Sequence, residues 1–359
     1  MNLREFKECI AFNIEHGIRH AILGLGAPGV GKSQVIRQIG DEFGYKVIDL
    51  RLAQMSEVEI GGLIYPNEDR TKTRWLSPEV LPDEERDGKK TILLLDEITS
   101  CPKRVQVAAY QLILDRRVGQ YRLPEGTFVI GLGNREDDDG VYIHLAGPLA
   151  DRFEILYIDV DFKTWKYDFA IPFKVHPYVV QYLSFKPTAL HTQKDDTESM
   201  IFATPRSWDR VSDILKCDND LKNPVVMHKI AGNVGSAEAA QFAKFILDGG
   251  YRLTAEDFLN GTAGAPSDPS EAGILTNSLI DMVSYLRDVK SPEDLSEKQK
   301  FEVKTVISAM FRLGQAEYTV VGLRDLLELN RALVKTLFFM QDDPQIEEFI
   351  NENKYMLGL

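Results

Sequence analysis

At residues 26–33 the chain reads Gly26-Ala27-Pro28-Gly29-Val30-Gly31-Lys32-Ser33, and this stretch is the strongest indication of the fold. A short apolar run precedes it, Ala21 to Leu25, and a helical pattern follows it, Ser33 to Phe43. Glycines let a backbone fold around phosphate groups and aim N–H groups at them, and the helix that follows adds a positive end. The order of strand, loop and helix is the context in which this pattern binds nucleotide phosphates. The alternative is a glycine-rich turn that opens a helix without any ligand.

The residue types of this loop assign its expected roles. Lys32 is expected to neutralise the outer phosphates of ATP, and Ser33 is expected to give its hydroxyl to Mg²⁺. ATP and Mg²⁺ are therefore the expected cofactors. The residues predicted to contact the nucleotide belong to the loop, the first helical turn and one later acid: Ala27, Pro28, Gly29, Val30, Gly31, Lys32, Ser33, Gln34 and Asp96.

Two carboxylates close a second apolar strand. Residues 91–95 are continuous and apolar after Thr91, and Asp96 and Glu97 follow them. Ligands of open parallel sheets bind at the carboxyl ends of the strands. We therefore expect Asp96 to share the magnesium ion with Ser33, and Glu97 to polarise the attacking water as a general base. The alternative is a pair of acids that caps the next helix.

Strands and helices alternate over the first 160 residues, and this alternation predicts a parallel sheet with helices on both faces. The expected fold class is α/β, a P-loop NTPase αβα sandwich followed by an all-helical lid and a C-terminal helical region. The predicted domains are residues 1–160, 161–258 and 270–359, with a linker rich in Gly, Ala and Pro at 261–269. The predicted segments are helices at 3–20, 105–114, 161–183, 205–215 and 236–247, strands at 45–52, 127–132 and 155–160, a hairpin arm at 119–123, and an exposed insertion at 63–75.

Composition narrows the classes of function. The 359 residues are 44% hydrophobic and 27% charged, no stretch is apolar enough to span a bilayer, and the N-terminus lacks the core of a signal peptide, so a cytoplasmic protein is expected. Three widely separated cysteines argue against disulfides and a zinc site. The net charge of −13 disfavours a general nucleic-acid binder and favours protein substrates.

The downstream motifs together resemble the AAA+ ATPases, and within them the MoxR-like branch. The residues that carry this resemblance are Asp96-Glu97-Ile98 with Cys101-Pro102 and Val105-Gln106, then Gly131-Leu132-Gly133-Asn134, Leu149-Ala150-Asp151-Arg152-Phe153 and Thr204-Pro205-Arg206-Ser207-Trp208. The likeness covers about residues 1–250. In one departure from the family, Asn134 is followed by Arg135 instead of the usual proline, which leaves the geometry of that loop open.

The resemblance implies roles for three further residues. It implies that Asn134 helps to position the attacking water, that Arg152 is an arginine finger acting on the ATP of a neighbouring subunit, and that Arg206 contacts the nucleotide from the lid. Cationic donors suit the charge that builds up on a transferred phosphoryl group. The alternatives are an Asp151–Arg152 surface ion pair and an Arg206 that only begins a helix after Pro205.

A finger in trans implies a ring, and the resemblance implies a hexamer that remodels a protein partner, in this branch commonly one with a von Willebrand A domain. The rival functions are a nucleic-acid-directed motor, such as a restriction or helicase-loading subunit, a small-molecule P-loop kinase and a non-hydrolysing switch.

Weaker signals have two interpretations each. Tyr65 and Trp75 of the insertion could grip a substrate or could pack their own loop. A basic group in the hairpin could touch nucleic acid or another subunit, or form a solvated edge: Arg116, Arg117 and Arg122. His16 and His20 are four residues apart, but we expect a helix end there, not a metal site.

Overall fold

The computed structural model describes residues 1–138, 143–145, 151–192, 201–247, 255–261, 264–266, 269–314, 316–339 and 344–357. Leu149 and Ala150 of the resemblance, and residues 262–263 and 267–268 of the expected linker, lie outside them. The chain forms two compact units. The first contains Met1–Trp165 and His191–Asp209, and the second contains Lys166–Leu190 and Arg210–Leu359. The three predicted domains, 1–160, 161–258 and 270–359, stay a prediction.

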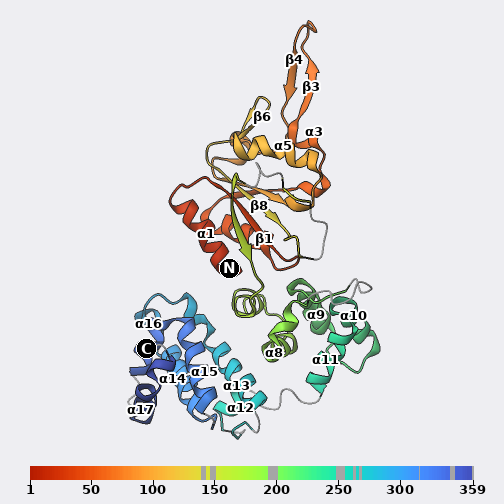
Figure 1. The fold of residues 1–359 in the computed structure, drawn as a ribbon. Helices are drawn as coiled ribbons and strands as arrows, with labels where there is room; N and C mark the ends of the chain where they lie inside the picture. The colour runs from red at the N-terminus through yellow and green to blue at the C-terminus, as the bar shows by residue number, and fades with distance from the viewer. Residues whose placement is uncertain are drawn as a thin grey trace. The chain divides into compact units, whose positions relative to one another are not determined.

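A five-stranded parallel sheet forms the centre of the first unit (Figure 1). Its order is β2-β5-β8-β1-β9, and all four pairings are parallel. This confirms the predicted parallel α/β sheet. The strands are β1 (Ala21–Gly26), β2 (Lys46–Arg51), β5 (Thr91–Asp96), β8 (Thr127–Gly133) and β9 (Phe153–Ile158).

Alternate side chains of each strand supply the two layers of the sandwich. In β5, Ile92 and Leu94 pack with helices α1 (Leu3–Glu15) and α2 (Lys32–Phe43). Leu93 and Leu95 pack on the opposite side with α3 (Glu57–Gly61) and α5 (Lys103–Leu114). Successive strand residues point to opposite faces, so a continuous apolar run fills two cores at once. The predicted αβα sandwich follows from this run.

The first helix is shorter than predicted. It ends at Glu15, with His16 as its C-cap, and does not extend to residue 20. Gly17 takes a left-handed φ of 66°, a conformation that glycine adopts at little cost and that stops a helix. Apolar spacing alone carried the prediction past this stop.

Two small hairpins extend from the sheet layers. The exposed insertion contains β3 (Leu63–Pro66) and β4 (Thr73–Leu76), an antiparallel ribbon that projects away from the five-stranded sheet in Figure 1. The second hairpin pairs β6 (Arg117–Val118) with β7 (Tyr121–Arg122). A short helix, α4 (Glu84–Asp87), lies between β4 and β5 in the sequence.

After β9 every described element is helical, as predicted. Helix α10 begins with an Asn223 cap and Pro224 in its first turn, a start signal that the predicted segments left out. The helices longer than four residues are α8 (Pro177–Phe185), α9 (Pro205–Cys217), α10 (Pro224–Val234), α11 (Ser236–Leu247), α12 (Ala255–Leu259), α13 (Pro269–Met282), α14 (Glu297–Phe311), α15 (Ala316–Leu329), α16 (Arg331–Phe339) and α17 (Pro344–Glu352). Short turns are α7 (Phe162–Trp165), a π-turn at Lys166–Ala170, and α18 (Lys354–Leu357).

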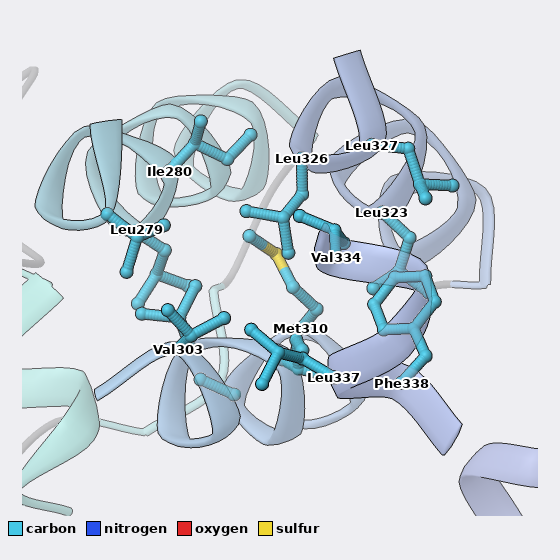
Figure 2. Close-up of a cluster of buried hydrophobic side chains, with 14 of the residues drawn as sticks. Leu279, Ile280, Val303, Met310, Leu323, Leu326, Leu327, Val334, Leu337 and Phe338 are labelled. Carbon is cyan, nitrogen blue, oxygen red and sulfur yellow. The ribbon is translucent and has the colours of Figure 1, made fainter. Parts of the chain in front are cut away.

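The second unit has an aliphatic core of its own, built mainly by α13 to α16. Figure 2 shows Met310 of α14 among Leu279 of α13, Leu326 of α15 and Val334 of α16. Two ion pairs attach the π-turn to this bundle. Lys166 Nζ lies 2.9 Å from the Asp281 carboxylate, and Arg287 Nη1 lies 3.0 Å from that of Asp168.

None of the helices in the described ranges combines the length and the apolar character needed to cross a bilayer.

Candidate active site

The glycine-rich loop joins β1 to α2 at the carboxyl edge of the sheet. Gly29 and Gly31 have φ values of 76° and 105°, in the left-handed region that a side chain would strain. A Cβ on Gly29 would lie 3.1 Å from the Thr204 hydroxyl, so the loop also needs glycine for close packing. The loop therefore has the conformation and the following helix that the phosphate-binding prediction requires.

Lys32 begins α2 and points back across the loop. Its ammonium donates to the carbonyls of Gly26 and Ala27, the second at 2.9 Å, and lies 3.3 Å from Asn134 Oδ1. Burial lowers the pKa of Lys32 to about 8, against the opposing charges of Asp138 and Asp96. A buried ammonium that is balanced mainly by carbonyl dipoles is a prepared site for an anion.

Ser33 and Asp96 face each other across the edge of the sheet. The Ser33 hydroxyl donates to Asp96 Oδ2 at 2.8 Å. Neighbouring ligands of an octahedral Mg²⁺ with bonds of about 2.05 Å lie about 2.9 Å apart, close to this separation. Hydroxyl and carboxylate oxygens are also the hard ligands that Mg²⁺ prefers. These two residues therefore fit the predicted magnesium site.

Glu97 occupies an uncommon backbone conformation beside Asp96. Its φ of 59° lies in the left-handed region, which costs a non-glycine residue about 1–3 kcal/mol. The Glu97 N–H donates to Asp96 Oδ1 at 2.9 Å, and its carbonyl accepts from Ser100 N–H at 2.9 Å. The side chain is exposed, so it is accessible to water. Strained residues of this kind cluster at active sites.

Asn134 follows the carboxyl end of β8 and lies beside Lys32. Both backbone groups of Asn134 bond to one side chain, the hydroxyl of Thr99. The N–H donates to Thr99 Oγ1 at 2.9 Å, and Thr99 Oγ1 lies 3.2 Å from the carbonyl oxygen. The structure thus brings together residues from the ends of three neighbouring strands: Lys32, Ser33, Asp96, Glu97 and Asn134.

Arg206 lies against the glycine-rich loop. Its N–H donates to the Gly29 carbonyl at 3.2 Å, and its side chain is exposed. The charge of Arg206 contributes to the lowered pKa of Lys32, after the larger effect of burial. Both the nucleotide contact and the alternative, a residue that begins α9, are compatible with this position.

Arg152 is apart from these residues. It directly precedes β9, whose first residue, Phe153, pairs with Ala21 at the start of β1, whereas the glycine-rich loop follows Gly26 at the other end. Five residue steps of about 3.3 Å place it about 16 Å from the loop along the strand direction. The side chain is exposed and forms no ion pair with Asp151 or any other described residue.

A charged pair missed by the motifs holds the loop after Asn134. Arg135 Nη1 donates to Asp159 Oδ1 at 2.7 Å, which lowers the pKa of Asp159, and the Arg135 N–H donates to Asp138 Oδ2 at 2.7 Å. Arg135 thereby links the ends of β8 and β9. Arg135 stands where the family usually has proline, and this difference was the signal in the sequence that could have identified it.

A small hollow adjoins the loop at Val30. Apolar side chains of Leu3, Val30, Trp165 and Pro205 line it, together with the carboxylate-bearing residues Asp159 and Asp161. Gln34 is exposed in the first turn of α2.

The weaker signals of the sequence have mainly structural explanations. Trp75 donates to the Gly61 carbonyl and contacts Gly119 of the neighbouring hairpin, so it packs. Arg116 donates to the carbonyls of Pro124 and Thr127 at 3.0 and 2.7 Å, whereas Arg117 and Arg122 pair across β6 and β7 with exposed side chains. His16 stacks on Phe12 at the end of α1, and the described residues contain no cluster of three or more His, Cys, Asp or Glu suited to a metal.

Comparisons with known proteins connect part of the chain to a family. Residues 21–152 match the model of the AAA domain, dynein-related subfamily. The chain matches no curated protein. Similar solved structures include a protein assigned as an ATPase from Cytophaga hutchinsonii, at 14% identity and a TM-score of 0.36 over 86% of this chain and 89% of that one. Another is a point mutant of RuvB from Thermotoga maritima, at 15% identity and a TM-score of 0.34 over 77% and 80%.

Proposed function

Because residues 21–152 match the dynein-related subfamily of AAA domains, we propose that this chain binds ATP with Mg²⁺ and hydrolyses it to ADP and phosphate. The observation that supports this most strongly is the convergence at the ends of β1, β5 and β8. Lys32 and Asn134 are 3.3 Å apart there, and Ser33 and Asp96 are 2.8 Å apart. The carboxyl ends of these strands thus hold a cation that can bind phosphate, oxygen ligands that can bind a metal, and a side-chain amide that can bind water.

In the proposed reaction each of these residues has one task. Lys32 exchanges its contacts with the carbonyls of Gly26 and Ala27 for phosphate oxygens. Ser33 and Asp96 would hold Mg²⁺, which would neutralise charge on the phosphates. Glu97 accepts a proton as the oxygen of water bonds to the terminal phosphorus and the bond from that phosphorus to the bridging oxygen breaks. The Asn134 amide orients this water.

We propose that the base of ATP lies beside Val30, in the hollow lined by Leu3, Trp165 and Pro205. Apolar walls suit the faces of a purine ring, and Asp159 and Asp161 offer acceptors for an amino group. The small volume of the hollow, about 10 Å³, requires its walls to separate when the base enters.

The proposed charge stabilisation comes from two arginines. Arg206, whose N–H bonds to Gly29, approaches from the same chain. Arg152 lies at the amino end of β9, whereas the ATP site lies at the carboxyl ends of the strands. We therefore propose that Arg152 acts on the ATP of a neighbouring copy. Such head-to-tail contacts close into a ring, and the family resemblance favours a hexamer. Native mass spectrometry of the ATP-bound protein should then give six chains of 40.6 kDa each.

The proposed cellular activity is remodelling or activation of a protein partner, with proteins that carry a von Willebrand A domain as the first candidates. This part rests on the MoxR-like motifs and on the acidic net charge of −13. The alternative is a nucleic-acid-directed motor. The exposed pair of Arg117 and Arg122 on one hairpin is the observation that favours it.

Glu97→Gln tests the proposed hydrolysis. It removes the base and keeps the phosphate and metal contacts, so turnover should fall by about 100-fold or more while ATP binding stays within about threefold of wild type. Phosphate release and binding of a fluorescent ATP analogue measure the two effects. Glu125→Gln, at an exposed carboxylate outside the site, is the matched control. A Glu97→Gln variant with wild-type turnover would show that another group is the base.

A further inference from the structure

Thr99 lies between the two halves of the proposed catalytic edge. It belongs to the short turn Ile98–Ser100 that follows Asp96 and Glu97, and its side chain is fully buried. No motif of the sequence assigns it a role. Its hydroxyl nevertheless reaches the end of a different strand, β8.

The Thr99 hydroxyl bonds to both backbone groups of Asn134. It accepts from the Asn134 N–H at 2.9 Å and lies 3.2 Å from the Asn134 carbonyl oxygen, to which it donates. Because the two bonds use one atom, they fix both the position and the orientation of the peptide groups beside Asn134. A second contact makes this arrangement tight. A Cβ on Gly133 would lie 2.6 Å from Thr99 Oγ1, so glycine is needed there.

We propose that Thr99 is a positioning residue for ATP hydrolysis, which holds Asn134 at the distance from Glu97 that the attacking water requires. This inference rests on the proposed function, in which Glu97 activates the water and Asn134 orients it. The turn that contains Thr99 is itself fixed to Glu97, because Ser100 N–H donates to the Glu97 carbonyl at 2.9 Å. The turn and the Thr99 hydroxyl together thus connect the backbone of Glu97 to the backbone of Asn134.

The same two strands carry an internal control. Thr91 and Thr127 pair at the starts of β5 and β8, and their hydroxyls lie 2.6 Å apart. Thr99 and Asn134 follow the carboxyl ends of these strands. Both threonines of β5 and its turn are fully buried and bond to β8 or its end, but only Thr99 bonds to a residue of the site. Loss of the Thr91 hydroxyl should therefore affect stability without affecting turnover.

The experiment measures kcat, KM and melting temperature of Thr99→Val, Thr99→Ser, Thr91→Val and Asn134→Ala. Thr99→Val should lower kcat about tenfold with KM changed less than about threefold, because small displacements of catalytic groups cost this much or more. Thr99→Ser keeps the hydroxyl and should stay within about twofold of wild type. Thr91→Val should lower only the melting temperature. In the Asn134→Ala background, Thr99→Val should cause little further loss.

Hydrogen exchange of the Asn134 backbone N–H provides a measurement that does not need turnover. Thr99→Val should speed this exchange, and Thr99→Ser and Thr91→Val should not. If Thr99→Val does not fold, Thr99→Ala replaces it: a packing role predicts graded losses from Ser to Ala, whereas positioning predicts a loss only without the hydroxyl.

Two results overturn the inference in distinguishable ways. A slow Asn134→Ala beside a Thr99→Val with wild-type kcat would remove the role of Thr99 and leave the proposed function intact. An Asn134→Ala with wild-type kcat would show that the proposed function misassigns Asn134, and the role of Thr99 would be lost with it.

Discussion

Replacing Arg152 with alanine tests whether the ATP site is completed by its own chain or by a neighbouring subunit. Arg152 begins about 16 Å from the glycine-rich loop of its own chain, because five residue steps of β1 separate Ala21 from Gly26. An extended arginine side chain spans about half of this distance. We therefore expect Arg152→Ala to lower hydrolysis about 100- to 1,000-fold, as loss of a charge-stabilising group does, while ATP affinity of the isolated subunit stays unchanged.

The fraction of wild-type activity that should return in mixed rings can be calculated. An active interface needs an intact Lys32 in one subunit and an intact Arg152 in the next. In rings assembled at random from equal amounts of Arg152→Ala and Lys32→Ala chains, each condition holds for half of the subunits. About one quarter of the interfaces are then complete, so activity should recover to about a quarter of wild type. If Arg152 acted within its own chain, no subunit would be complete and no activity would return.

The assay is phosphate release at saturating ATP, after the two variants have been unfolded or dissociated together and reassembled. Two affinity tags, purified in succession, establish that the rings contain both chains. Arg122→Ala mixed with Lys32→Ala is the control, since Arg122 is an exposed arginine on a hairpin away from the site. Absence of recovery in doubly tagged rings would show that Arg152 does not act on the ATP of a neighbouring subunit.

Two of the remaining predictions concern the contacts of Lys32 and Arg116, and a third concerns nucleic acid. Since Lys32 has a pKa of about 8 and phosphate favours its charged form, ATP affinity should fall about tenfold from pH 7 to pH 9. Titrations of the protein with ATP at both pH values measure this change. Lys32→Arg should abolish the pH dependence. Arg116→Ala removes the half-buried guanidinium that donates to the carbonyls of Pro124 and Thr127, so the free energy of unfolding should fall by about 1–3 kcal/mol, measured by thermal melting, with kcat unchanged. Duplex or single-stranded nucleic acid should not stimulate hydrolysis; stimulation that falls steeply with salt and disappears in Arg117→Glu/Arg122→Glu would favour the nucleic-acid motor.

An unchanged affinity between pH 7 and pH 9 would contradict the first of these, because it would mean that Lys32 is already fully charged without phosphate. An Arg116→Ala with the melting temperature of wild type would show that water replaces the guanidinium without cost.

Local patterns in the sequence were sufficient to predict the parallel sheet and the residues that meet at the carboxyl ends of its strands. The loop at Gly26 to Ser33 and the acids after β5 are each encoded by neighbouring residues, and strand–helix alternation predicts that parallel strands bring them to one edge. The helix ends were less predictable. Gly17 stopped α1 where apolar spacing continued, and the cap of α10 at Asn223 was left out.

The supporting contacts could not be predicted, because they join residues that are far apart in the chain. Thr99 and Asn134 are separated by 35 residues, and Arg135 and Asp159 by 24. No periodicity or spacing relates such pairs, so they become visible only when the strand order is known. The position of Arg152 at the opposite edge likewise depends on the register of β9 with β1.

The ion pair between Lys166 and Asp281 limits how the chain can be recombined with helices from another protein. The Lys166 side chain is only 1% exposed, and its carboxylate partner comes from α13, 115 residues later. A chimeric protein in which another helix replaced α13, without a carboxylate at position 281, would leave this ammonium buried without its counter-charge, which typically costs about 3–5 kcal/mol. A protein that exchanges the C-terminal helices therefore needs either a carboxylate at that position or a substitution at Lys166.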